Sequence, residues 1–235
     1  MKVLLSIITV ITFSLCLSSC AFVPVNNQYE KAGTLKKGNI ELSGNVTGNS
    51  ITGVGESAAI NNNFGFRAGY GITDKFDLKI RYERLIPTTK NEDGFNGANY
   101  ISIVPKFALI PNKLSLLVPL SRYSFTDVNS ESKSSLNSIA PNVLYTITGA
   151  KKKNDVTFGL KTDFLFGGGG SKEFEGGGGA VILGLTVGAG FSSDLSKWAV
   201  RPEVGMSYLG AGAFLNYGVG FQFIIPGKKR LNVGN

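Results

Sequence analysis

The sequence predicts an all-β fold, an antiparallel up-and-down β-barrel of about ten membrane-embedded strands. Apolar and polar residues alternate from residue 39 onward, which is the period of a strand with one apolar face. The connections between the alternating runs are short and long in turn, as expected for neighbouring antiparallel strands that meet at the two ends of a barrel.

The predicted strands follow one another with turn residues between them. Their apolar faces start at Ile40, Leu42 and Val46, and the last one contains Tyr217, Phe221 and Phe223. The ten runs are residues 40–46, 60–70, 76–82, 101–109, 114–120, 139–147, 156–166, 181–191, 198–208 and 215–223. Most are near the length of about 9–11 residues that a tilted strand needs to cross a bilayer.

The lengths of the connections predict how the barrel is oriented. The short turns are residues 71–75, 111–113, 149–154 and 192–197, and the long loops are residues 47–57, 87–97, 126–135 and 167–177. Only residues 209–212 are short where a long loop is due. Because membrane barrels of bacteria place short turns in the periplasm, an even number of strands predicts that both ends of the barrel chain lie there.

Four prolines fall inside predicted strands, namely Pro105, Pro119, Pro141 and Pro202. Proline cannot donate to a strand ladder, and a closed barrel has no free edge at which to place it. Either bulges accommodate these prolines or the barrel is partly open.

The inward face of the predicted strands carries both signs of charge. Glu41 lies on this face. Ten further residues of the face form a predicted lumen charge network: Arg67, Asp77, Lys79, Arg81, Glu83, Lys106, Lys161, Asp163, Arg201 and Glu203. Near balance of charge is what a satisfied internal network requires. Because about ten strands make a barrel only modestly wider than the eight whose side chains fill it, we expect a filled lumen rather than a pore. A soluble barrel with its apolar face inside remains an alternative.

The first twenty residues predict export. Lys2 precedes an apolar stretch over residues 3–17, which ends in Leu17-Ser18-Ser19-Cys20. This resembles the bacterial lipobox, and the resemblance implies that Cys20 carries fatty acid (palmitate) after cleavage. An ordinary signal peptide with a chance cysteine is the alternative. Ala21 resembles the residues that direct lipoproteins to the outer membrane.

These features divide the chain into four parts. Residues 1–19 are the predicted lipoprotein signal peptide, which is cleaved, and residues 20–38 are a lipidated N-terminal tether without periodicity. Residues 39–225 form the barrel, and residues 226–235 form a C-terminal tail. Since Cys16 and Cys20 are the two cysteines, the mature barrel has no disulfide.

Three stretches resemble a known class of protein. Residues 66–78 are similar to a hairpin of small outer-membrane barrels and porin-like proteins, and residues 201–205 and 216–221 are similar to their last two strands. The resemblance implies the bacterial outer membrane and its lipid as the surroundings, with no catalytic residue. The sequence departs from that class after Phe223, because such barrels usually end on an aromatic residue of the last strand.

Composition excludes several activities. The chain has no histidine, which removes Ser-His and Cys-His nucleophiles and His-ligated metals. The inward carboxylates have basic neighbours and are expected to form structural ion pairs. We therefore expect no enzyme activity, no metal and no cofactor. Nucleic acid is not an expected partner despite the net charge of +8, because export separates the chain from it.

Lysine and arginine gather near the predicted periplasmic end, at residues 36, 37, 75, 113, 151–153, 197 and 228–230. This basic rim is predicted to contact the heads of inner-leaflet phospholipids or peptidoglycan, unless the lysines serve only as soluble turn residues. Three functions remain open: a structural or interaction module with a side-chain-filled lumen, a narrow pore or small-solute transporter, and a soluble periplasmic lipid-binding lipoprotein.

Overall fold

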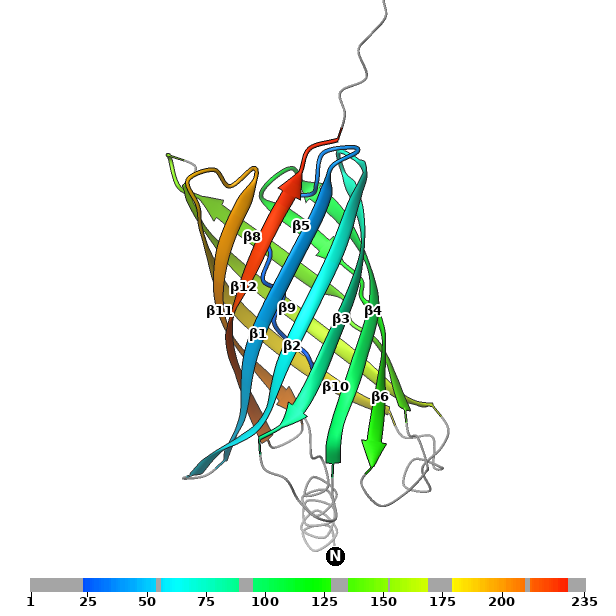
Figure 1. Cartoon of the computed structure of the whole chain (residues 1–235). Coiled ribbons are helices and arrows are strands. Elements are labelled where there is room, and N and C mark those ends of the chain that lie inside the picture. The colour runs from blue at the N-terminus through cyan, green and yellow to red at the C-terminus, as the bar shows by residue number, and fades with distance from the viewer. Residues whose placement is uncertain are drawn as a thin grey trace, which may run out of the picture.

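The computed structural model describes residues 23–53, 56–88, 95–127, 135–151, 153–168, 179–209 and 212–227. The lipobox, including Cys20, lies outside these ranges. In the described ranges twelve strands form one sheet (Figure 1). They are β1 (Ile40–Gly53), β2 (Glu56–Thr73), β3 (Phe76–Pro87), β4 (Phe95–Ile110), β5 (Leu114–Leu117), β6 (Leu120–Asp127), β7 (Ser135–Ile139), β8 (Asn142–Thr148), β9 (Asn154–Gly168), β10 (Gly179–Phe191), β11 (Trp198–Leu209) and β12 (Gly212–Ile225).

The sheet closes on itself through antiparallel pairs. β1 pairs with β2 on one side and with β12 on the other, with Ile40 opposite Ile225. β5 and β6 both pair with β4, whereas β7 and β8 both pair with β9, so each of these two couples occupies one position in the wall. The twelve strands thus make ten positions, and the predicted antiparallel barrel of about ten strands is confirmed.

The four prolines are accommodated without opening the wall. Pro105 and Pro202 lie within β4 and β11. Of the four prolines, only Pro119 and Pro141 lie between strands, where the strand structure is interrupted. At both breaks a backbone amide next to the proline still bonds across the wall: Val118 N donates to Pro105 O and Ala140 N to Pro119 O, both over 3.0 Å. The alternative of a partly open barrel is therefore wrong.

The first hairpin is longer than expected. Residues 47–57 were predicted to be a long loop, but β1 and β2 run on to Gly53 and from Glu56, with a register shift at Asn49/Ser50. The prediction failed because these residues are polar and show no apolar period, whereas the backbone ladder of a hairpin does not require one.

The apolar side chains point outward and the polar ones inward. Phe66, Ile80 and Leu185 are 52%, 61% and 50% exposed, whereas their inward neighbours Arg67 and Arg81 are buried. This is the reverse of a soluble barrel, which hides its apolar face, so that alternative does not describe the fold. None of the described residues belongs to a helix long and apolar enough to cross a membrane.

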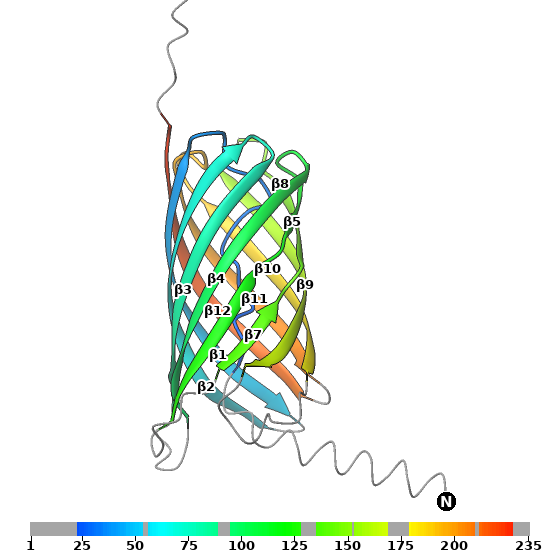
Figure 2. The same cartoon turned by 90° about the vertical axis from the view of Figure 1, so that its right-hand side faces the viewer.

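The N-terminal segment, residues 23–37, is not a free tether. It passes through the inside of the barrel before β1 begins, as the blue chain behind the strands in Figure 2 shows. Val23, Val25, Tyr29, Glu30 and Ala32 are all buried. This course could not be predicted, since a segment without regular structure has no period.

Candidate functional site

The N-terminal segment crosses the lumen from one end of the barrel to the other. Val23 N donates to Asn61 Oδ1 over 3.0 Å, and Asn61 lies opposite Pro87, the last residue of β3 before a long connection. At the opposite end, Leu35 N donates to both carboxylate oxygens of Asp77 over 2.8 and 2.9 Å, next to the short β2–β3 turn. The segment therefore begins at the long-loop end and finishes at the short-turn end.

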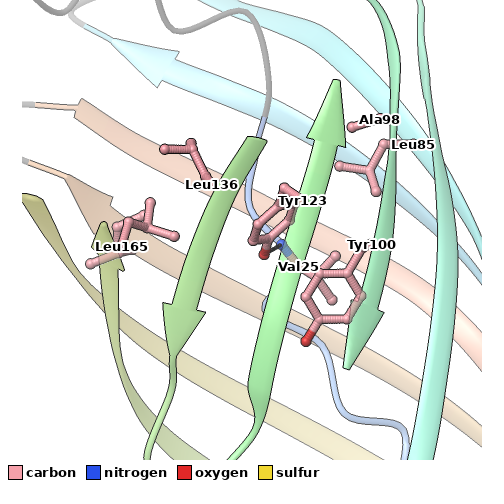
Figure 3. Packing of buried hydrophobic residues seen from close by; sticks show 8 residues of the cluster. Val25, Leu85, Ala98, Tyr100, Tyr123, Leu136 and Leu165 are labelled. Atoms are coloured by element: carbon pink, nitrogen blue, oxygen red, sulfur yellow. Dashed lines mark hydrogen bonds between the residues drawn. The ribbon is translucent and has the colours of Figure 1, made fainter. Parts of the chain in front are cut away.

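An apolar cluster surrounds the start of the segment inside the lumen. Val25 packs among inward-facing side chains contributed by six strands, as Figure 3 shows for most of them: Leu85, Ala98, Tyr100, Tyr123, Leu136, Leu165 and Ile182. Val25 N also donates to the Tyr123 hydroxyl over 3.2 Å. The inward face was predicted to be polar. These apolar side chains were not predicted to point inward, because they alternate in phase with the polar residues of their strands.

Glu203 and Tyr29 fix the middle of the segment. The Glu203 carboxylate accepts hydrogen bonds from the backbone amides of Gln28 and Tyr29 over 2.7 and 2.8 Å. The Tyr29 hydroxyl lies 2.6 Å from Thr47 Oγ1. Tyr29 has a positive φ of 52°, and its side chain lies against Gly220, where an added Cβ would come within 2.6 Å of the Tyr29 Cβ. The glycine in β12 thus leaves the space that Tyr29 occupies.

Glu30 is held by three cations from three neighbouring strands. Its carboxylate lies 3.1 Å from Arg67 of β2, 2.6 Å from Lys79 of β3 and 2.8 Å from Lys106 of β4. Glu41 shares two of these cations, at 3.2 Å from Arg67 and 3.0 Å from Lys79. All five side chains are buried, so the contacts join the segment to the wall away from bulk water. We call these five residues the Glu30 cluster.

The remaining charges form smaller groups, one of which is joined to the Glu30 cluster by Gln222, whose side chain accepts from Arg201 and donates to Glu41. Arg81 pairs with Glu83, and Lys161 pairs with Asp163 at 3.0 Å while donating to the backbone oxygen of Val25. Arg201 makes a two-pronged contact with Asp155, at 2.8 and 3.0 Å.

The structure buries all ten side chains of the predicted lumen network, which are Arg67, Asp77, Lys79, Arg81, Glu83, Lys106, Lys161, Asp163, Arg201 and Glu203. Their partners differ from the expected ones in two places. Asp77 and Glu203 accept backbone amides of the segment, although each was expected to pair with a basic neighbour on its own strand. These donors are backbone amides of the N-terminal segment, whose place inside the barrel could not be predicted because the segment has no alternating pattern.

Two charged partners were missed by sequence reasoning. Asp155 stands between the predicted turn at residues 149–154 and the predicted run at residues 156–166. It alternates in phase with Lys161 and Asp163, and that phase could have identified it as inward-facing. Glu30 had no such signal, because it lies outside the alternating runs.

The short-turn end carries the predicted basic rim. Lys36, Lys37, Lys75, Lys113 and Lys197 are exposed there, while residues 152 and 228–230 lie outside the described ranges. Lys197 pairs with Asp194 at 3.3 Å. Hydrogen bonds from the Ser196 hydroxyl and amide lower the pKa of Asp194, so this carboxylate stays ionised beside the lysines.

The site offers hydrogen bonds and ion pairs between a segment and a wall. Within the described residues, no group of three or more histidine, cysteine, aspartate or glutamate side chains could hold a metal ion. The chemistry visible in the lumen is that of attachment: Glu30 and the backbone amides of Val25, Gln28, Tyr29, Ala32 and Leu35 meet complementary groups on the wall.

The described residues define a closed antiparallel barrel with an apolar exterior, a polar lumen and a segment of its own chain inside. No protein-family model matches the sequence, and no curated protein matches it. Solved structures of outer-membrane barrels are similar in fold alone. Ail of Yersinia pestis matches at 9% identity over 80% of this chain and 99% of that one, with a TM-score of 0.34. Neisserial surface protein A matches at 11% over 80% and 99%, with 0.43, and the outer membrane protease OmpT from Escherichia coli matches at 12% over 83% and 100%, with 0.43.

Proposed function

We propose that this protein is a bacterial outer-membrane lipoprotein whose barrel is closed by its own N-terminal segment and serves a structural or interaction role. The single observation that carries the proposal is the Glu30 cluster, which ties residues 23–37 to the wall inside the lumen. A barrel filled in this way is a poor diffusion channel, and what it presents to partners is its loops and rims.

The outer face supports membrane embedding. Large apolar and aromatic side chains such as Phe64, Phe158 and Leu185 are about half exposed on successive strands. In water such a surface would be unfavourable by roughly 25 cal/mol per Å² of apolar area. In a bilayer the same surface meets hydrocarbon, and the closed ladder leaves no backbone edge unpaired.

The proposed lipid anchor is supported by the sequence around Cys20, and the proposed partners are supported by the charge of the basic rim. Acyl chains on Cys20 would add attachment at about 0.8 kcal/mol for each buried methylene. The exposed lysines of the basic rim are placed to meet anionic phospholipid heads of the inner leaflet or peptidoglycan, at about 1 kcal/mol per well-placed charge.

A narrow pore is the second candidate function, and one observation favours it. On the β7–β9 wall, the Asn142 amide, Ser138 Oγ and Asp163 Oδ1 are buried polar atoms with no hydrogen-bond partner among the described residues. A thread of water passing beside the segment would satisfy them. The third reading, a soluble lipid-binding lipoprotein, is disfavoured because such a barrel needs an apolar interior.

Planar-bilayer recording of the purified full chain tests the proposal. We expect no steady current from the wild type, because the N-terminal segment and its ion pairs fill the lumen. Glu203→Ala removes the acceptor of two segment amides and should produce intermittent openings. Steady, ion-selective single-channel currents from the wild type would instead establish the pore, and failure to partition into detergent would exclude the membrane barrel.

A further inference from the structure

The side of the membrane on which the N-terminus emerges follows from the course of the segment. With an even number of wall positions, Ile40 and Ile225 lie at the same end, as expected, and that is the short-turn end. The N-terminus was expected to share this periplasmic side. The described part of the chain instead begins near the long-loop end, because residues 23–37 run back through the lumen and Val23 bonds to Asn61 there.

We propose that the chain before Val23 leaves the barrel at the long-loop end and that the protein is anchored in the outer leaflet, at the cell surface. This inference rests on the proposed function, which supplies the outer membrane, the orientation and the acylated Cys20. The partner is a lipid surface: the acyl chains attached at Cys20 enter the hydrocarbon of the outer leaflet beside the barrel's own loops.

The length of the chain between Cys20 and Val23 limits where Cys20 can lie. Cys20 is three residues from Val23, and three Cα–Cα steps of about 3.8 Å limit their separation to about 11 Å. Asn61, which binds Val23, is ten residues along β2 from Gly71, which binds Gly38 at the short-turn end. Ten residues of a strand tilted by about 40° span about 25 Å along the barrel axis. Cys20 itself therefore cannot lie at the short-turn end of the barrel while Val23 keeps its place.

The course of the segment is fixed at several depths. Val25 lies in the apolar cluster at the long-loop end, and Glu30 lies in the Glu30 cluster. Ala32 N donates to Thr146 Oγ1 over 2.7 Å. Thr34 Oγ1 then donates to Asp74 O over 2.8 Å at the short-turn end. A segment held at each of these depths cannot reverse its direction without breaking buried contacts.

Thiol labelling of intact cells with a membrane-impermeant maleimide tests the sidedness. The processed chain is expected to have no free thiol, so single cysteines report their own position. Phe22→Cys precedes the segment, Ser171→Cys lies in the β9–β10 connection, and Lys113→Cys lies in a short turn. We expect Phe22→Cys and Ser171→Cys to react in intact cells, and Lys113→Cys to react only after the outer membrane is permeabilised.

A second arm covers the case in which lipid shields position 22. A site-specific protease sequence inserted between Ala21 and Phe22 should be cut in intact cells, whereas the same sequence after Asn235 should be cut only after permeabilisation. If Ser171→Cys is labelled but the N-terminal insertion is cut only in permeabilised cells, the surface anchor is wrong while the membrane barrel stands. If Ser171→Cys is protected and Lys113→Cys reacts, the orientation in the proposed function itself is wrong.

Discussion

At the scale of single residues, the placement of Glu30 is governed by the cost of burying a charge. An isolated carboxylate inside a protein is strongly unfavourable, but contacts with Arg67, Lys79 and Lys106 at 2.6–3.1 Å compensate for the lost water. If the segment left the lumen, Lys106 would lose its carboxylate partner, and Arg67 and Lys79 would keep only Glu41. The cluster therefore couples the position of the segment to the stability of the wall.

Glu30→Gln tests this coupling. The amide keeps the shape of the side chain but removes the charge that three buried cations face, so we expect the free energy of unfolding to fall by about 3–5 kcal/mol. Urea unfolding in detergent micelles, followed by tyrosine fluorescence and gel migration, measures the loss.

The control is Asp194→Asn, which removes an exposed carboxylate from the rim and should change stability little. Combining Glu30→Gln with Lys106→Met should recover part of the loss, because Lys106 contacts Glu30 directly. Equal stability of Glu30→Gln and wild type would contradict the assignment of Glu30 to the lumen.

Gly220→Ala tests the packing of Tyr29 against β12. Its new Cβ would lie 2.6 Å from the Tyr29 Cβ, so the segment or β12 must shift, and overpacking of this kind typically costs about 1–3 kcal/mol. Gly44→Ala is the matched control, since a Cβ there would meet its nearest neighbour, Gly65 O, at an ordinary 3.6 Å. Thermal unfolding of both variants should separate them, and an equal small effect would place Tyr29 elsewhere.

At the scale of the strand, side chains of β9 and β10 alternate between the outer surface of the barrel and its lumen. Phe158 and Leu185 face outward and Thr157 and Thr186 face inward, because side chains alternate along a strand. The outward set forms part of the surface proposed to meet lipid, and the inward set meets the lumen.

Leu185→Arg and Phe158→Arg place a charge on the outward face. If the face lies in hydrocarbon, each should lower the free energy of unfolding from lipid vesicles by about 2–4 kcal/mol near the midplane. Thr157→Ser is the inward control, because serine can keep the hydrogen bond of 2.8 Å with Thr146. Wild-type stability in both arginine variants would argue against membrane embedding.

The strands could be predicted from sequence because their period is local. The outward residues Ile80 and Leu185 stand in alternating runs, and the ten runs correspond to the ten wall positions. The extension of β1 and β2 past residue 47 could not be predicted, since polar residues such as Asn49 and Asn61 face the lumen there and bond to other amides. Sequence period identifies a strand only where one of its faces is apolar.

At the scale of the whole molecule, the barrel and its N-terminal segment form one folded unit. Glu30 contacts residues 37, 49 and 76 positions away in sequence, and Asn26 contacts Asn216 across 190 positions. Such contacts leave no trace in a local pattern, which is why the ten wall charges could be listed from sequence but the segment that binds them could not. Charge balance on the inward face predicted a filled lumen, but the N-terminal segment, residues 23–37, supplies much of the filling.

Amide hydrogen exchange on the wild-type protein in micelles tests the central claim most directly. The backbone amides of Val25, Gln28, Tyr29, Ala32 and Leu35 each donate to a side chain of the wall. We expect them to exchange as slowly as the ladder amides of β2 and β3, because the segment can open only when the barrel does. Exchange of these five amides at the rate of an unstructured chain, while the strands remain protected, would contradict a lumen closed by the N-terminal segment.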